Sequence, residues 1–535
     1  MDNTYSGSSG IVGALRPASC WRSLPRIRVV AAAALVLGLT LWVYWNTLSP
    51  TINSFDSAEL ITGAYTLGIV HAPGYPLYLL LAHVATRLPW GSIAYNVNLM
   101  SAVFGSLAAG VVFYASWRLS RALWASALAA LLLAFSRMYW GEAVVAEVYT
   151  LNALLIGGVI LAAILFYENP GGKTLIALAI TFGLSLTHHP SALLLGPGLV
   201  ALVLYRVRGR GIGGKAWVAA LFGLSAPLLL YLYLPLRYVA DPALNYVGDY
   251  FDVNLASVEG LIWMVSGRMF SQELFGRSLV EGLGQILSLG LNIWLNFIGA
   301  GLVLALYGLV MLRTRMALAF FLGGSAAAIL LFFAFYDVVD NAQMLLPVLV
   351  LLTPPLAIGL DSFMRQARQR ISLHGRIQPV MAGLLVFAAA ILLIAANWRF
   401  ADRSEDWSAY DFAQQVMAEV EPGALILAQW TSATPLEYVQ IVEGLRPDVE
   451  ILDRGLLALG IRDKLNREGT ESLVDANSMA LAALIDRVNR EMSDRPVYIM
   501  ENDPVLRGSF CYQVLNVNIY RLFPHATSPA TCPGQ

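Results

Sequence analysis

Long apolar segments recur from residue 29 to residue 397 of this 535-residue chain, and they constrain its fold more than any other feature. A helix needs about 20 mostly apolar residues to cross a bilayer. The chain is 58% hydrophobic and only 13% charged, whereas soluble domains carry about a quarter charged residues. The sequence therefore predicts a polytopic α-helical membrane protein. Its eleven predicted spans are 29–48, 95–117, 122–137, 144–167, 173–187, 190–205, 216–236, 285–312, 316–336, 342–361 and 378–397.

The stretch 60–90 is also apolar, but Pro73, Pro76 and Pro89 interrupt it. Because proline breaks a helix from within, we predict surface or re-entrant helices here rather than another span. Residues 1–28 are polar and basic, and we predict a cytoplasmic tail. The apolar segment that follows this tail is too long for the core of a cleavable signal peptide.

Basic residues divide unevenly between the two sides of the predicted spans. With the N-terminus inside, 17 lie on inner segments and five on outer loops, which satisfies the positive-inside rule. An odd number of spans then places residues 398–535 outside. This topology predicts a multi-pass protein of a plasma membrane, most simply a bacterial inner membrane, with a cytoplasmic N-terminus and an extracytoplasmic C-terminus. The inner residues are Arg16, Arg22, Arg26, Arg28, Arg118, Arg121, Lys173, Arg206, Arg208, Arg210, Lys215, Arg313, Arg315, Arg365, Arg368, Arg370 and Arg376, and the outer ones are Arg87, Arg137, Arg237, Arg268 and Arg277.

Residues 398–535 follow a different pattern. Short runs rich in strand-forming residues alternate there with helical patterns at 433–445 and 478–492. This alternation predicts a small extracytoplasmic α/β domain. It contains Cys511 and Cys532, whose pairing the sequence leaves open. The predicted strands lie in GALILAQW, DVEIL, RPVYIM and CYQVLNVNIYRLF.

The first predicted outer loop, 49–94, holds two carboxylates three residues apart, Asp56 and Glu59. This is the spacing of a capping box, with Asp56 as the N-cap of a surface helix and Glu59 at its third position. The same spacing places both carboxylates on one helix face, where one could take the proton of an acceptor hydroxyl. Both interpretations stay open. A divalent metal is not expected, although carboxylates can bind one, because no ligand set with metal spacing surrounds the pair.

Further polar residues lie near the predicted outer face. Glu147 lies inside the start of the fourth span, where an ionisable group is costly and usually faces a cavity or a partner. His189 lies in the turn between spans five and six, and Arg237 at the outer mouth of span seven. An arginine there either snorkels to headgroups or holds a phosphate. The chain has no nucleotide-binding, zinc or nucleic-acid motif, so we predict no nucleic-acid partner.

Several segments resemble one known family. FDSAELITGAYTLGIVHAPGYPLYLLL is similar to the signature of domain-of-unknown-function family 2723, which includes the multispanning protein O-mannosyltransferases that resemble transmembrane protein 260. The resemblance covers most of the chain from residue 50 to about residue 455. It implies a GT-C glycosyltransferase fold over 29–397, with a catalytic first outer loop. The other similar segments are AEVYTLNALL, LTHHPSALLL, YLYLPLR, DPALNYVGD, YDVVDNAQMLLPVLV and LEYVQIVEGLRPDVEIL.

Matched position by position, the resemblance implies roles for individual residues. Asp56 and Glu59 would be catalytic, with Asp56 as the base of a single inverting displacement. Phe55 and Ala58 stand where the family has glycines, which makes the backbone around Asp56 less permissive. The donor and its phosphate would contact Arg237, Arg268, His71, Tyr75, Glu147, Tyr149 and His189. The loops would be shaped by Gly74, Pro76, Asp241, Asn245 and Asp340.

The resemblance implies a membrane enzyme that moves a sugar, mannose or another, from a polyprenyl-phosphate donor to a hydroxyl of an extracytoplasmic protein or glycan. Such a donor carries its own leaving group, so no nucleotide is needed. Two alternatives are a transporter or flippase of polyprenyl-linked glycans and a non-catalytic binding protein. A transporter would show repeated broken helices with polar groups near the membrane midplane. Here the acidic residues gather at the outer face and no internal repeat is visible, which favours the enzyme.

Overall fold

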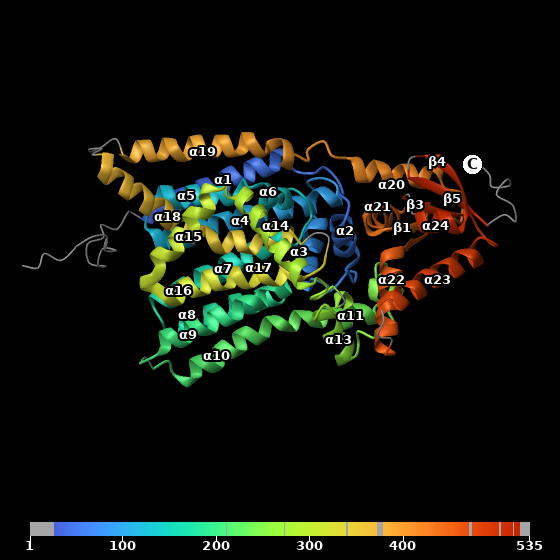
Figure 1. Ribbon diagram of the computed structural model, residues 1–535, viewed down its shortest axis with the longest axis horizontal. Coiled ribbons are helices and arrows are strands. Elements are labelled where there is room, and N and C mark those ends of the chain that lie inside the picture. The colour runs from blue at the N-terminus through green and yellow to red at the C-terminus, as the bar shows by residue number, and fades with distance from the viewer. Residues whose placement is uncertain are drawn as a thin grey trace, which may run out of the picture.

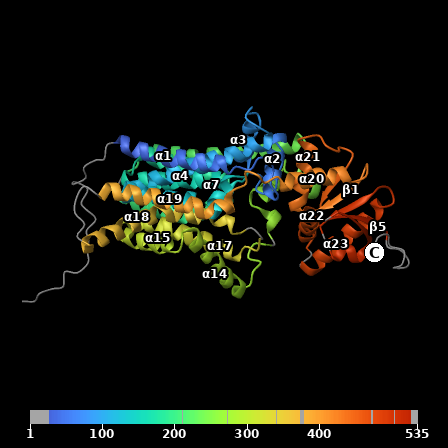
Figure 2. The same cartoon turned by 90° about the horizontal axis from the view of Figure 1, so that it is seen from above.

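The structure is a computed structural model with two parts, a long bundle of helices and a smaller α/β part beyond one end of it (Figures 1 and 2). The α/β part, orange to red in Figure 1, lies at the end of the bundle where α2 and α3 also lie. The described residues are 26–209, 211–271, 273–338, 341–371, 378–469, 473–501, 504–516 and 518–524. Residues 1–25 of the predicted cytoplasmic tail, Asp340 and Cys532 lie outside them, so the predictions for these residues stay predictions.

Apolar sequence builds the bundle from α-helices joined by short 3-10 and π-helical turns. The helices up to residue 239 are α1 (Arg26–Asn46), α2 (Asp56–Thr66), α3 (Pro76–Thr86), α4 (Ile93–Ser120), α5 (Leu123–Ala134), α6 (Arg137–Ala143), α7 (Tyr149–Glu168), α8 (Gly172–Leu186), η2 (Pro190–Leu195), α9 (Gly196–Val207), α10 (Gly214–Ser225), η3 (Ala226–Leu232) and α11 (Tyr233–Val239). Those that follow are α12 (Tyr246–Tyr250), α13 (Val258–Val265), η4 (Arg268–Phe270), α14 (Leu279–Asn296), α15 (Ala300–Met311), η5 (Leu312–Arg315), α16 (Met316–Ala319), η6 (Phe320–Gly324), α17 (Ser325–Phe335), η7 (Gln343–Leu345), α18 (Leu346–Ile371) and α19 (Gln378–Ala401).

Eight helical stretches of the described chain are long and apolar enough to cross a membrane, or nine if the bent pair α5 and α6 counts as one span. The polytopic helical class is confirmed, but the count is lower than the eleven predicted. The apolar stretch 60–90 forms α2 and α3, of 11 residues each, so the prediction that it holds short helices rather than a span is confirmed. The eight stretches are Arg26–Asn46, Ile93–Ser120, Tyr149–Glu168, Pro190–Val207, Gly214–Val239, Ala300–Phe335, Gln343–Ala367 and Met381–Ala401.

Three predicted spans account for the difference. The segment 122–137 does not continue as one helix, because α5 and α6 are bent by 67° where they meet. The segment 173–187 is α8, whose 15 residues rise only about 22 Å, less than the ~30 Å hydrocarbon core of a bilayer. The segment 285–312 is divided between α14 and α15, and its second half continues into the stretch Ala300–Phe335.

Helices α15 and α18 touch backbone to backbone at two glycines. A Cβ atom on Gly308 would lie 1.8 Å from the carbonyl oxygen of Pro355, and one on Gly359 would lie 1.9 Å from that of Leu304. Small residues are what allow two membrane helices to approach this closely. Any side chain at either position would push the two helices apart.

The α/β part contains a sheet whose described strands run in the order β2-β1-β3-β5-β4. The strands are β1 (Leu425–Ala428), β2 (Glu450–Asp453), β3 (Val497–Met500), β4 (Cys511–Asn516) and β5 (Ile519–Phe523). β1 pairs in parallel with β2 and β3, while β5 pairs antiparallel with β3 and β4. All four segments predicted as strands fold as strands, the last as a hairpin. The helices are α20 (Ser408–Glu419), α21 (Trp430–Ile441), α22 (Arg454–Arg467), α23 (Leu473–Glu491) and α24 (Pro504–Ser509).

Two of these helices, α21 and α23, correspond to the predicted helical patterns at 433–445 and 478–492. Helices α20, α22 and α24 have no counterpart among the predictions. The sheet is stabilised by burial, since every residue of β1 and β3 is buried.

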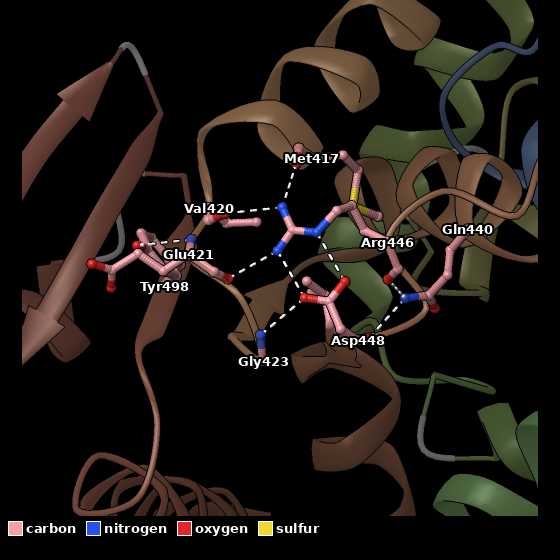
Figure 3. Close-up of polar contacts among 9 residues, drawn as sticks. Met417, Val420, Glu421, Gly423, Gln440, Arg446, Asp448 and Tyr498 are labelled. Atoms are coloured by element: carbon pink, nitrogen blue, oxygen red, sulfur yellow. Dashed lines mark hydrogen bonds and ion pairs between the residues drawn. The ribbon is translucent and has the colours of Figure 1, made fainter.

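One arginine fastens the end of α20 to the loop before β2 (Figure 3). The guanidinium of Arg446 donates to the carbonyl oxygens of Met417 and Val420, at 2.6 and 2.9 Å, and to Glu421 at 3.0 Å. It also holds the carboxylate of Asp448, at 2.9 and 3.0 Å. The last carbonyls of a helix have no partner within the helix, so Arg446 supplies the missing donors and fixes α20 against the sheet.

We predict that Gly308→Ala lowers the free energy of unfolding by about 1–3 kcal/mol, the typical cost of overpacking, because its methyl group must separate α15 from α18. The measurement is the apparent unfolding midpoint of the purified protein in detergent. Gly383→Ala in α19 is the matched control, since a Cβ there has no atom within 4 Å. Equal midpoints for the two variants would contradict the close packing.

Candidate active site

Helix α2 begins at Asp56, directly after a residue with an unusual backbone. Phe55 is the N-cap, with φ 65° and ψ −139°, and its side chain makes no cap hydrogen bond. The predicted capping box is therefore wrong: Asp56 is the first helical residue, not the N-cap, and Glu59 is directed to another partner. The positive φ is a conformation that favours glycine, and it lies at the position where this chain departs from the family signature.

Glu59 is fully buried, and both of its carboxylate oxygens are bonded to His71. Oε1 accepts the backbone N–H of His71 at 2.7 Å, and Oε2 lies 2.7 Å from the ring nitrogen Nδ1. Burial raises the pKa of Glu59, although the contacts with His71 act in the opposite direction. Glu59 and His71, which are 12 residues apart in the predicted catalytic loop, are thus joined by two hydrogen bonds.

Asp56 is held from two sides. Its Oδ1 accepts the indole N–H of Trp430 at 2.9 Å, and its Oδ2 lies 3.7 Å from Nε2 of His71. Its side chain is 23% exposed, whereas that of Glu59 is 0% exposed. Asp56 is therefore the carboxylate of this pair that a substrate can reach.

Three aromatic rings pack against His71. The ring centroids of Tyr75, Trp430 and Phe270 lie 5.2, 5.5 and 6.3 Å from that of His71. These residues come from the loop before α3, from the first residue of α21 and from η4. Three segments that are far apart in the sequence therefore contribute the aromatic rings that pack against this histidine.

Tyr75 connects Asp56 and Glu59 to the predicted fourth-span residues. Burial, and after it the charges of Asp56, Glu59 and Glu147, raises the pKa of Tyr75. Its ring lies 6.3 Å from that of His189, which in turn lies 6.4 Å from that of Tyr149. The structure thus brings most of the predicted catalytic and donor-contacting residues into one connected set: Asp56, Glu59, His71, Tyr75, Glu147, Tyr149 and His189.

The histidine turn is buried. Burial lowers the pKa of His188 to about 4 and that of His189 to about 3. His188 Nε2 lies 2.8 Å from the carbonyl oxygen of Val148, and His189 Nδ1 accepts the backbone N–H of Ser191 at 3.1 Å. Both rings are neutral at physiological pH and serve as hydrogen-bonding groups.

The loop between α2 and α3 depends on one glycine. Gly74 has φ 83°, and a Cβ there would lie 2.6 Å from the side chain of Leu234. Pro76 opens α3 at its first position, where a missing N–H is harmless. Among the other residues predicted to shape loops, Asn245 accepts the backbone N–H of Gly248, and Asp241 follows α11 with φ 47°.

The two predicted phosphate arginines lie in different places. Arg237 donates from Nε to the carbonyl oxygen of Leu67 at 2.7 Å and from Nη2 to that of Thr66 at 3.2 Å. It thereby supplies hydrogen-bond donors to the C-terminal end of α2. Asp56 lies at the other end of this helix, roughly 15 Å away along its axis. Arg268 lies in η4, two residues before the Phe270 that packs on His71. The role in phosphate binding stays a prediction for both.

Arg268 also lines a cavity of about 470 Å³ between residues 252–271 and α22. Most of its lining residues are polar or charged. The indole N–H of Trp263 donates to Asp463, on the opposite element, at 2.9 Å. The charged residues that line the cavity are Asp252, Glu259, Arg268, Asp463 and Arg467.

Sequence reasoning missed the contribution of the α/β part. Glu437 of α21 is buried and its Oε2 accepts the hydroxyl of Tyr246 at 2.5 Å. Burial raises its pKa well above the usual carboxyl range. Trp430 ends the run GALILAQW that we predict as a strand, but no local pattern connects it to Asp56, which lies 374 residues earlier.

Asp56, Glu59 and His71 could together hold a cation. Each offers one ligand atom, and these atoms lie within 4.8 Å of one another. Carboxylate and imidazole groups suit divalent metals. The two oxygens of Glu59 already accept from His71, so a cation would have to replace one of those bonds.

Residues 56–211 match the family model described as the protein O-mannosyl-transferase TMEM260 N-terminal domain, a match that begins at Asp56. The predicted resemblance is confirmed. The chain is 27% identical over 466 residues to protein O-mannosyl-transferase TMEM260 of Mus musculus and 24% identical over 499 residues to the Dictyostelium discoideum protein of that name.

Each alignment to a TMEM260 protein covers 82% of this chain, but only 64% of the mouse and 59% of the Dictyostelium protein. Among solved structures, ArnT from Cupriavidus metallidurans bound to undecaprenyl phosphate matches with a TM-score of 0.56 at 14% identity, covering 93% of this chain and 97% of ArnT. The GT-C-like fold implied by the TMEM260 resemblance is therefore confirmed.

We predict that the stability gained from Asp453→Asn rises with pH. Asp453 opens α22, where its Oδ1 accepts two backbone N–H groups, an arrangement that asparagine can keep. Burial raises its pKa from 3.8 to about 6. Since the folded state then holds the proton to higher pH than the unfolded state, ionisation opposes folding between about pH 4 and pH 6.

The expected gain over wild type is therefore small below pH 4 and grows to about 3 kcal/mol above pH 6, at 1.36 kcal/mol per unit of pKa. Unfolding midpoints of both proteins across this range measure it. A difference that stays constant with pH would contradict the ionisation of a buried Asp453.

Proposed function

We propose that this chain is a membrane glycosyltransferase that moves a sugar from a polyprenyl-phosphate donor to an acceptor hydroxyl. The observation that carries the proposal is the position of Asp56 beside His71, which is itself bonded to Glu59, at the start of the region that matches the TMEM260 domain. The GT-C-like fold, similar to an ArnT structure bound to undecaprenyl phosphate, supports a polyprenyl-phosphate donor. The names of the relatives support mannose as the sugar and a protein as the acceptor.

The base in this proposal is Asp56. A general base must reach the proton that it takes, and Asp56 is partly exposed while Glu59 is enclosed. Glu59 would serve the reaction indirectly, because its two bonds fix both the backbone and the ring of His71. His71 would then limit how far the neighbouring carboxylate of Asp56 can turn.

The reaction is a single displacement at the anomeric carbon. The acceptor hydroxyl forms a new C–O bond to that carbon while the bond to the phosphate oxygen breaks, and Asp56 receives the hydroxyl proton. The products are the glycosylated acceptor, with inverted configuration, and the polyprenyl phosphate. Arg268 is the better placed of the two arginines to compensate the charge of the departing phosphate, because Arg237 is bonded to the end of α2.

We propose that this site lies on the extracytoplasmic side of a plasma membrane. The site and the α/β part lie at the same end of the bundle (Figure 1). Arg118 and Arg121 pair with Glu168 at the other end of α4, whose 28 residues rise about 42 Å. Basic residues remain on the cytoplasmic side of membrane proteins, which supports this orientation.

Asp56→Asn should lower the turnover of sugar transfer by about 10²–10⁴, the usual contribution of a general base. The measurement is transfer of radiolabelled sugar from a polyprenyl-phosphate donor by the purified protein in lipid nanodiscs. Asp411→Asn, an exposed change of the same kind in α20, is the control. Undiminished transfer by Asp56→Asn would remove Asp56 from the mechanism, and failure of that variant to fold would assign it a structural role.

The same assay tests whether the reaction needs a metal. Because Glu59 is already bonded to His71 through both oxygens, we expect treatment with EDTA to leave turnover unchanged within about twofold. We also expect added Mg²⁺, Mn²⁺ or Zn²⁺ not to raise it. Loss of transfer on chelation, restored by one of these ions, would show that Asp56, Glu59 and His71 act as a metal site.

A further inference from the structure

We propose that Trp430 is a positioning residue of the transfer reaction, supplied to the membrane site by the α/β part. Its indole N–H would fix the carboxylate of Asp56 in the orientation needed to receive the acceptor proton. This inference rests on the proposed function and adds to it a residue outside the region 56–211 that matches the TMEM260 domain. It also gives the α/β part a role in catalysis.

The first observation is the contact itself. Trp430 Nε1 donates to Asp56 Oδ1 at 2.9 Å, while the other carboxylate oxygen lies 3.7 Å from Nε2 of His71. A hydrogen bond to one oxygen of a carboxylate restricts its rotation about the Cβ–Cγ bond. The second oxygen then keeps a defined position beside His71, where the side chain of Asp56 is still partly exposed.

Trp430 itself packs against two aromatic rings. Its ring centroid lies 5.5 Å from that of His71 and 5.5 Å from that of Tyr246. Tyr246 is fixed in turn, because its hydroxyl donates to the buried carboxylate of Glu437. A side chain clamped in this way can orient a neighbour, whereas a mobile indole could not.

A second bond joins the same two helices. Thr434 Oγ1 donates to the backbone carbonyl of Phe55, the N-cap residue directly before α2, at 2.9 Å. Trp430, Thr434 and Glu437 follow one another at intervals of four and three residues, so they lie on one face of α21. This face of α21 therefore binds the start of α2 through two groups, the backbone carbonyl of Phe55 and the side chain of Asp56.

The sheet explains why Trp430 occupies this place. It follows the carboxyl end of β1 by two residues, and β1 pairs in parallel with β2 and β3 on either side. In open α/β sheets ligands bind beyond the carboxyl ends of the strands, where the strand order reverses. Here that edge of the sheet is directed at Asp56, so the acceptor would meet both parts of the protein at once.

The test is Trp430→Phe, which keeps an aromatic ring but removes the N–H. Trp398→Phe, near the end of α19, is the matched control. Trp398 Nε1 also donates to a carboxylate, that of Asp402, at 2.9 Å. Misplacing a catalytic group by a small distance costs up to about 10²-fold. We therefore expect kcat to fall about 10–100-fold in Trp430→Phe, with KM for the donor unchanged within about twofold, and neither constant to change in Trp398→Phe.

An NMR measurement tests the contact between Trp430 and Asp56 without depending on turnover. In protein labelled with ¹⁵N-tryptophan, the Trp430 indole resonance is the one lost in Trp430→Phe. We expect it to move in Asp56→Asn and to stay in place in Asp411→Asn. If the chemical shift of the Trp430 indole is the same in Asp56→Asn as in wild type, the contact is absent in the protein and the inference is wrong.

The outcomes also separate the inference from the proposed function. If wild type transfers sugar and Trp430→Phe does so with equal kcat, the positioning role is wrong while the glycosyltransferase stands. A rise in KM together with a loss of folded protein in Trp430→Phe would reduce Trp430 to a packing residue. If wild type transfers sugar from no donor, the proposed function fails and the inference fails with it.

Discussion

The buried carboxylate of Glu59 is the constraint on which the rest of the site depends. A charged or polar group without solvent must find partners inside the protein, and Glu59 finds both in His71. These two bonds fold the loop after α2 back onto the helix. They place the ring of His71 beside Asp56 and against Tyr75, which connects the loop to the histidine turn.

The site is shared by parts of the chain that are distant in sequence. The membrane part supplies the carboxylates and the histidine, and the first residue of α21 supplies the donor that holds Asp56. The orientation of the Asp56 carboxylate is therefore set by contacts from both parts of the chain. The cavity lined by Arg268 lies between residues 252–271 and α22, so residues from both parts line it as well.

Local signals made much of this predictable from sequence. Hydropathy indicated the helical class, strand-forming runs indicated the sheet, and the prolines in 60–90 indicated short helices there rather than a span. The predicted capping box does not form because the side chain of Glu59 bonds to His71 instead. The bend between α5 and α6 removes one of the predicted spans. The contact between Trp430 and Asp56 is set by the docking of two folded parts, and no periodicity within either segment carries that information.

The most direct test of the account is transfer from a panel of radiolabelled polyprenyl-phosphate sugars by the wild-type protein in nanodiscs, with a cell extract as acceptor and nucleotide sugars as the comparison. The account predicts that label from one polyprenyl-phosphate sugar, and from no nucleotide sugar, becomes covalently attached to an acceptor with inverted anomeric configuration. Label that reaches no acceptor from any donor, while the donors still bind or cross the bilayer, would contradict it and favour a binding protein or a transporter.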